Sequence, residues 1–278
     1  MSCELNTSAD SEHWTLDTDI LIHQRGVDAK IRSAAQGLLV TKKPTAISAF
    51  SMVELKGNFI QDLILLRHKV SDSDDLREAY SRIARSGGRK QQLMLVQLID
   101  WLGGTNFAPN PWAPARAQLL THLDAQILAS WSSFAGIVDK ILDDFQCTRA
   151  REPPMASGNA WNATIPRCTK ANTSCSIEAF MARHLDALKK LSAALATLPV
   201  ADVTNELDKI RTIVDETIAS GRFPWQGTRC RGVGDLLVSL QSKSTHGLVS
   251  SNRKEQVVLS KALEYDWHFF DSVAIRSG

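Results

Sequence analysis

The chain has 278 residues, of which 44% are hydrophobic and 22% charged, and 32 Lys and Arg against 30 Asp and Glu give a formal net charge of +2. This composition excludes a collagen-like chain, a coiled-coil rod and a wholly disordered protein. The nearly neutral balance also argues against nonspecific nucleic-acid binding driven by the charge of the whole molecule, so any contact with nucleic acid must depend on a local site.

The sequence predicts no membrane segment and no secretory signal. The longest uncharged apolar stretch, 125–138, has 14 residues, whereas a membrane span needs about 18. The N-terminus, Met-Ser-Cys-Glu-Leu-Asn, lacks a basic start followed by an apolar run. Five cysteines are too few for a disulfide scaffold, and their number is odd. We therefore expect a cytoplasmic protein with reduced thiols.

The N-terminal part predicts two strands, each followed by an acidic residue. A short buried strand within 14–22 runs into Asp17 and then into a turn or helix start. The segment 45–50 has the Ile and aromatic content of a second strand. Ser51 and Glu54 have the spacing of a capping box, which predicts that Ser51 begins a helix and that Glu54 bonds back to its first turn.

The middle of the chain has helical periodicity. Apolar residues recur every three or four positions in the segments 71–86, 91–102, 114–145, 177–198 and 203–218. The helix over 91–102 is apolar nearly all round, which predicts that it is buried. The segment 147–175 is rich in Pro, Ser, Asn and Thr and is predicted to be a loop, and loops that long are usually functional, metal-stabilised or disordered.

The last part returns to alternating helices and strands. The pattern predicts helices over 234–240 and 253–263, a strand within 246–252 and a final strand within 267–275. In an open parallel sheet, ligands bind beyond the carboxyl ends of the strands, near the point where the strand order reverses. Polar residues stand at such ends or in the helices that adjoin them: Asp17, Glu54, Asp235 and Asn252.

These residues lie in segments that resemble the PIN-domain nucleases. The matching segments are Leu16-Asp17-Thr18-Asp19, Ser48-Ala-Phe-Ser51-Met-Val-Glu54-Leu, Gly234-Asp235-Leu-Leu-Val and His246-Gly-Leu-Val-Ser250-Ser-Asn252-Arg-Lys. Glu54 follows Asp17 by 37 positions and Asn252 follows Asp235 by 17, both similar to the spacing in the family. Asn252 stands where many members carry a fourth acid and others carry Asn.

The resemblance implies an α/β fold with a PIN-like doubly wound parallel sheet that is interrupted by a large α-helical insertion. The first part of the PIN-like domain would span 1–70, the insertion with its Cys-containing loop 147–175 would span 71–228, and the second part would span 229–278. Small toxin nucleases of the family are about one PIN domain long, so a toxin-antitoxin role is an analogy only.

The resemblance also implies a Mg²⁺- or Mn²⁺-dependent endoribonuclease. Asp17, Glu54 and Asp235 would bind the metal and Asn252 would assist, because these hard cations prefer carboxylate oxygens and keep several waters. The bound ion would support hydrolysis of an RNA phosphodiester that leaves a 5′-phosphate.

Each of these acids also has a structural interpretation. Asp17 and Asp19 could form a turn after a strand, Glu54 could belong to a capping box, and Asp235 could face a helix dipole. Taken singly, each structural interpretation is stronger, but the ordered set favours the metal site. Ser250 either steadies a carboxylate or a phosphate, or ends a strand.

A structural zinc site is a separate hypothesis. Cys147, Cys168, Cys175 and His184 have the composition of a Cys₃His site, with Cys230 as a substitute. The spacing Cys-x6-Cys does not match a zinc ribbon, however, and we favour a buried structural His with Cys as small apolar residues.

RNA is the expected substrate partner, and five basic residues flank the C-terminal polar positions and could meet phosphates or form a solvated surface: Arg229, Arg231, Lys243, Arg253 and Lys254. The alternative function is a non-catalytic PIN-like scaffold whose helical insertion binds a protein partner in a regulatory or defence complex. A third reading, a plain helical interaction protein, predicts no parallel sheet.

Overall fold

The computed structural model describes residues 12–24, 28–104, 111–146, 154–157, 160–162, 176–223 and 232–277. The chain divides into two compact units. The first comprises Met1–Val53, Val138–Glu152 and Pro166–Gly278, and the second comprises Glu54–Ile137 and Pro153–Ile165. The segment 177–220, which lies within the predicted insertion, therefore belongs to the first unit.

The first unit contains a five-stranded sheet. Its strands are β1 (Trp14–Leu16), β2 (Thr45–Ser48), β3 (Lys140–Leu142), β6 (Gly247–Ser250) and β7 (Trp267–Phe269), in the order β3-β2-β1-β6-β7. All neighbouring strands are parallel. The α/β class is thus confirmed, and the reading as a plain helical protein is wrong.

The strand order reverses between β1 and β6. From β1 the chain builds β2 and β3 on one side, and it later adds β6 and β7 on the other side. β2 and β6 are buried along their whole length, as is usual for strands of a parallel sheet that is covered on both faces. The carboxyl ends of β1 and β6 therefore meet at the kind of reversal where open α/β sheets form a crevice.

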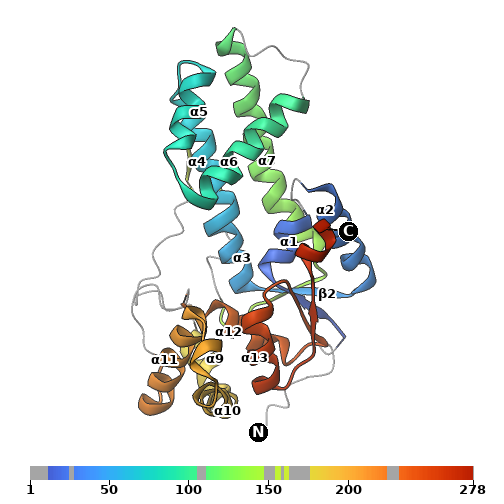
Figure 1. Cartoon of the computed structure of the whole chain (residues 1–278), viewed down its shortest axis with the longest axis vertical. Helices are drawn as coiled ribbons and strands as arrows, with labels where there is room; N and C mark the ends of the chain where they lie inside the picture. The colour runs from blue at the N-terminus through green and yellow to red at the C-terminus, as the bar shows by residue number, and fades with distance from the viewer. Residues whose placement is uncertain are drawn as a thin grey trace. The chain divides into compact units, whose positions relative to one another are not determined.

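The helices of the first unit are α1 (Thr18–Gln24), α2 (Ala29–Thr41), the start of α3 (Ala49–Leu55), α9 (Ile177–Arg183), α10 (Leu185–Ala196), the 3₁₀ turn η2 (Val200–Asp202), α11 (Asn205–Ser220), α12 (Gly234–Ser242), α13 (Arg253–Leu263) and α14 (Ser272–Ser277). Helix α10 packs against both α11 and α13, and α12 packs against α13 (Figure 1). Local signals explain their ends: Thr204 caps α11, and Gly221 ends it in the left-handed conformation at φ 67°.

Three sequence predictions for this unit need correction. Helix α3 begins at Ala49, because the Ser48 hydroxyl accepts the Phe50 N–H at 3.0 Å, so Ser51 lies inside the helix and does not cap it. The predicted helix over 114–145 ends at Ile137, and Lys140–Leu142 forms strand β3. The final strand within 267–275 ends at Phe269 and gives way to α14.

The second unit is mainly helical. It contains the end of α3, the π-helical segment η1 (Lys56–Ile60), α4 (Gln61–Ser71), α5 (Leu76–Ala84), α6 (Gly88–Gly104), α7 (Trp112–Ile137) and an antiparallel hairpin of β4 (Met155–Ser157) and β5 (Ala160–Asn162). Helix α4 packs along α7, and α5 and α6 pack on α4 (Figure 1). Their shared core includes Leu66, Ile83, Met94, Leu98 and Trp112.

Helix α6 is not buried on all sides. Met94 and Leu98 lie in the core, whereas Ile99 is 62% exposed. The expectation of complete burial for 91–102 is therefore wrong, and α6 leaves apolar surface uncovered within its own unit. Among the described residues, none of the helices combines the length and apolar character that a membrane span requires.

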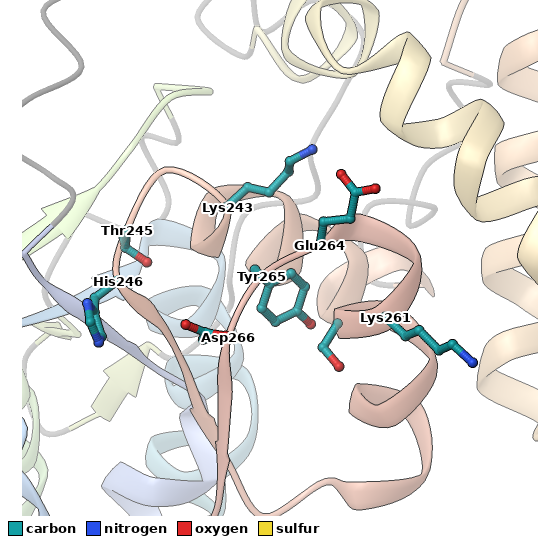
Figure 2. A pocket seen from close by; sticks show the side chains of 8 residues that line it. Lys243, Thr245, His246, Lys261, Glu264, Tyr265 and Asp266 are labelled. Atoms are coloured by element: carbon teal, nitrogen blue, oxygen red, sulfur yellow. The ribbon is translucent and has the colours of Figure 1, made fainter.

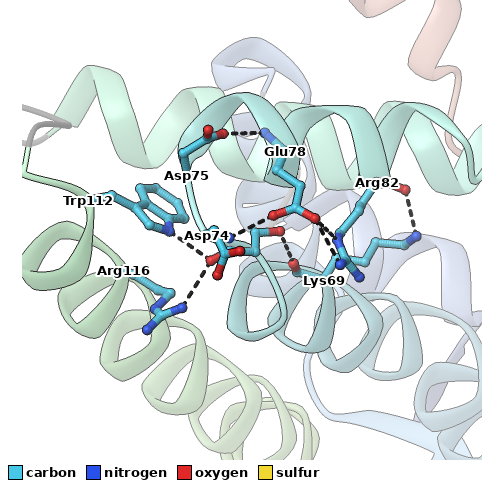
Figure 3. A network of polar contacts seen from close by, with 8 residues as sticks. Lys69, Asp74, Asp75, Glu78, Arg82, Trp112 and Arg116 are labelled. Atoms are coloured by element: carbon cyan, nitrogen blue, oxygen red, sulfur yellow. Dashed lines mark hydrogen bonds and ion pairs between the residues drawn. The ribbon is translucent and has the colours of Figure 1, made fainter.

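A polar network fixes the turn between α4 and α5 (Figure 3). Asp75 caps α5 by accepting the Glu78 N–H at 2.6 Å, and the Glu78 carboxylate accepts the Asp74 N–H at 2.7 Å. The carbonyl of Ser73 accepts hydrogen bonds from the Trp112 indole at 2.9 Å and from the guanidinium of Arg116 on α7 at 3.0 Å. Side-chain capping of a helix start, which was expected at Ser51, is thus found at this turn, although Glu78 bonds to the residue before the cap and not to the cap itself.

Candidate functional site at the reversal of the sheet

Asp17 stands directly after β1 and is 7% exposed. Its N–H donates to the carbonyl of Val249 at 2.9 Å, which continues the pairing of β1 with β6 by one residue. Its Oδ1 accepts the Thr18 N–H at 2.7 Å, and its Oδ2 accepts the hydroxyl of Ser250 at 2.7 Å. Of the alternatives for Ser250, the structure shows both the contact with a carboxylate and the strand end, and Asp17 lies at the reversal of strand order.

A second pair of polar side chains joins this one through Ser250. The Ser250 hydroxyl oxygen accepts the backbone N–H of Asn252 at 2.9 Å, and the Asn252 side-chain amide donates to Oδ2 of Asp235 at 3.0 Å. Asp235 lies in the first turn of α12, and Asn252 precedes α13. A continuous series of hydrogen bonds therefore links Asp17 to Asp235, which are far apart in the sequence.

Asp19 belongs to the same end of the sheet. Its Oδ2 accepts the backbone N–H of Ser251 at 2.8 Å and also the Ser251 hydroxyl. Because Ser250 binds Asp17 and Ser251 binds Asp19, two consecutive serines at the end of β6 hold two acids that follow β1. Ser251 was not among the predicted site residues, although its place directly after a buried strand is the signal that could have identified it.

Burial and charge alter the protonation of Asp17. Loss of hydration raises its pKa most, the negative charge of Asp19 raises it further, and the bonds from Ser250 and Thr18 lower it, which leaves a pKa of about 7. A carboxyl group with a strongly raised pKa at such a crevice is a candidate for a functional group.

The negative charges of Asp17 and Asp235 also affect the pKa of Tyr265. Its pKa is raised above the usual value, first by burial and then by the negative charges of Asp17 and Asp235, against a lowering by its bond to Ser239. Both carboxylates therefore lie within electrostatic reach of one hydroxyl. Tyr265 was not among the predicted residues, because a lone tyrosine between a helix and a strand carries no sequence signal.

Glu54, the remaining predicted ligand, lies near the end of α3 and is half-buried. It belongs to the second unit, so its role beside Asp17 and Asp235 stays a prediction. Within the described ranges, no group of three or more His, Cys, Asp and Glu side chains is arranged to hold a metal ion.

A cavity of about 380 Å³ lies at the other end of the strands, away from the acids (Figure 2). Thr245 and His246 come just before β6 and Asp266 just before β7, so the cavity adjoins the amino ends of these strands. The other lining residues are Lys243, Ser260, Lys261, Glu264 and Tyr265. The cavity and the acids thus occupy different ends of the same strands.

Of the residues predicted to bind zinc, only His184 lies among the described residues. Cys147, Cys168, Cys175 and Cys230 lie outside the described residues. His184 lies between α9 and α10, with its ring 4.6 Å from that of Phe180. Burial lowers the pKa of His184, and the charge of the adjacent arginine lowers it further. This environment suits a neutral packed imidazole, and the zinc site stays a prediction.

The basic residues proposed to meet phosphate are also partly outside the described chain, since Arg229 and Arg231 are not described. Lys243 lines the cavity, Lys254 is exposed, and the guanidinium of Arg253 lies 5.6 Å from the ring centre of Phe269.

Comparisons of the chain with protein-family models, curated proteins and solved structures gave no match. The functional assignment therefore depends on the site geometry.

Proposed function

We propose that the protein is a metal-dependent endoribonuclease of PIN-like type. The observation that carries the proposal is the hydrogen-bonded series from Asp17 through Ser250 and Asn252 to Asp235 at the reversal of the strand order. Acids that come from opposite ends of the chain meet where open parallel sheets bind their ligands. The sheet order and the long helical stretch between β2 and β3 support a doubly wound PIN-like domain with a helical insertion.

The donor set suits Mg²⁺ or Mn²⁺. These cations prefer oxygen ligands, and Mg²⁺ is commonly held by one or two carboxylates together with waters and substrate phosphate. Burial raises the pKa of Asp17 most, and the negative charge of Asp19 raises it further, so the two acids repel each other when both are ionised. A divalent cation near them would relieve this repulsion and favour their ionised forms.

The roles of the residues follow from their contacts. Asp17 and Asp235 would bind the metal, and Glu54 is the predicted third ligand. Asn252 orients the Asp235 carboxylate through its amide, and Ser250 holds Asp17. When bound, the cation polarises a phosphodiester and makes water more acidic, which is the chemistry that RNA hydrolysis requires.

The test is cleavage of a panel of RNAs by the full chain in Mg²⁺ or Mn²⁺ and in EDTA. Asp17→Asn, Asp235→Asn and Glu54→Gln remove one carboxylate each, and each should reduce cleavage by on the order of 100-fold or more. Asp186→Asn is the matched control, because this aspartate of the first unit is 97% exposed. Full activity of the Asp17→Asn, Glu54→Gln double variant would exclude the assignment.

The alternative, a non-catalytic scaffold that binds a protein partner, is supported by apolar surface on the second unit. Tyr80 on α5, Ile99 on α6 and Leu128 on α7 are 53%, 62% and 50% exposed, so three helices of this unit leave a large apolar side chain that a partner could cover. Absence of metal-dependent cleavage over the RNA panel, together with a fixed partner that co-purifies with the chain, would favour this alternative.

A further inference from the structure

The two helices that carry Asp235 and Asn252 share a second pair of polar side chains. Ser239 follows Asp235 by four residues on α12, and Gln256 follows Asn252 by four residues on α13. Four residues are about one helical turn. The Ser239 hydroxyl lies 3.4 Å from Oε1 of Gln256, so the pairing at the helix starts is repeated one turn deeper.

Tyr265 completes this deeper pair. Its hydroxyl lies 2.6 Å from Oε1 of Gln256 and 3.0 Å from the Ser239 hydroxyl. Helix α13 ends at Leu263, and the capping residue Glu264 has a left-handed φ of 60°. The Tyr265 N–H donates back to the carbonyl of Ser260 at 3.2 Å, which holds Tyr265 against the end of the helix. Figure 2 shows the ring of Tyr265 among the residues that line the cavity.

Because the side chains of Ser239 and Gln256 are buried, the loss of these hydrogen bonds would be costly. Ser239 and Gln256 are fully buried, and a buried polar group that loses its partner is costly because it cannot bind water instead. In the described part of the chain, Nε2 of Gln256 has no hydrogen-bond partner. The Tyr265 hydroxyl is therefore the short contact that orients the Gln256 side chain. Burial raises the pKa of Tyr265 most, and the charges of Asp17 and Asp235 raise it further, so the hydroxyl stays protonated and can donate.

We propose that Tyr265 is a positioning residue for the acidic site: by binding Gln256 and Ser239, its hydroxyl sets the spacing of α12 and α13 that aligns Asp235 with Asn252. The catalytic consequence rests on the proposed function, whereas the alignment of Asp235 with Asn252 does not. Groups behind the ligands of a metal typically change metal affinity or activity by 10- to 100-fold when removed.

The experiment compares Tyr265→Phe with Tyr80→Phe, which alters the other of the two tyrosines in the chain. Tyr80 lies on α5 and is 53% exposed, so it is a matched control. The first readout is the ¹⁵N–¹H signal of the Asn252 side-chain amide without metal, assigned by its loss in Asn252→Asp. The second readout is the Mn²⁺ concentration that gives half-maximal RNA cleavage.

We expect Tyr265→Phe to shift the Asn252 amide signal, to speed its exchange with solvent and to raise the half-maximal Mn²⁺ concentration by roughly tenfold. Tyr80→Phe should change neither readout. An unchanged amide signal in folded Tyr265→Phe would overturn the positioning role, whether or not the protein cleaves RNA. Wild-type protein that cleaves no RNA would overturn the proposed function but leave the amide readout to decide the role of Tyr265.

Ser239→Ala provides the second variant, because it removes one partner of the Tyr265 hydroxyl and leaves the ring packing intact. If Tyr265→Phe does not fold, a shift of the Asn252 amide in Ser239→Ala supports the proposal. An Asn252 amide identical to that of the wild type would then overturn it.

Discussion

The Ser250 hydroxyl donates to the Asp17 carboxylate at 2.7 Å, and this bond joins residues that are 233 positions apart. It forms because β1 and β6 are neighbours in register, with Leu16 beside Val249. Asp17 directly follows β1 and Ser250 is the last residue of β6, so the two side chains meet where the paired strands end. The pairing of β1 with β6 thus fixes the position of the Asp17 carboxylate beside Ser250.

Ser250→Ala should raise the pKa of Asp17 above its value of about 7, because the Ser250 bond lowers that pKa. Loss of a hydrogen bond to a buried charged group should also reduce the free energy of unfolding by about 1.5–3 kcal/mol at pH 8. Carboxyl ¹³C NMR titration and urea unfolding measure the two effects. Ser192→Ala is the control, since Ser192 binds the exposed Asp215; an unchanged Asp17 pKa in Ser250→Ala would contradict the contact.

Asp17 should make stability fall as the pH rises. Its folded pKa of about 7 exceeds the ordinary value of 3.8, so between these values the folded state keeps a proton that the unfolded state releases. The unfolding free energy should therefore decrease from about pH 4 to pH 7, by at most about 4 kcal/mol, and change no further through Asp17 above that range. Urea unfolding between pH 4 and pH 8 measures this slope.

Asp17→Asn supplies the control for the pH series. The amide does not titrate, so the variant should lose the part of the slope between pH 4 and pH 7 that Asp17 contributes. The same slope in wild type and Asp17→Asn would show that another group is responsible.

Asn252→Asp should destabilise the metal-free protein and make its stability depend on a divalent cation. The Asn252 amide lies 3.0 Å from Oδ2 of Asp235, so the substitution replaces a donor by a second carboxylate. We expect a loss of about 1–3 kcal/mol without metal, largely restored by millimolar Mn²⁺. Thermal unfolding with and without Mn²⁺ measures this, and a Tm that Mn²⁺ raises no more than in wild type would count against a metal site here.

Asp124→Ala should strongly destabilise the second unit. Asp124 accepts bonds from Nε and Nη2 of Arg67 and from the indole of Trp161, and the Arg67 side chain is only 10% exposed. The variant removes one partner of a largely buried ion pair, which typically costs about 3–5 kcal/mol. Glu206→Ala, which breaks the exposed pair with Lys209, should cost under about 1 kcal/mol in the same urea titration.

A smaller loss in Asp124→Ala than in Glu206→Ala would mean that the Arg67 bonds do not stabilise this unit. Fluorescence of Trp161 offers a second check, because its indole loses its partner only in Asp124→Ala.

Elements with local signals could be predicted from the amino-acid sequence alone. The helix over 253–263 begins and ends where its pattern predicts, because a polar residue precedes it and a continuous helical period fills it. The α/β class was also predictable, because short apolar segments followed by acids at both ends of the chain are typical of strands in a parallel sheet. The polar positions Asp17, Asp235 and Asn252 followed from the same reasoning.

Which residues contact one another depended on the packing of the whole chain. Strand β3 has three residues, and its Ile141 also fits the helical spacing of the segment before it, so periodicity could not distinguish the two; pairing with β2 made it a strand. Ser239 and Tyr265 carry no local signal, and the only local signal of Ser251 is its place directly after a buried strand. They gained their roles because the order of the strands brought distant parts of the chain into hydrogen-bond distance, and such contacts depend on the whole fold.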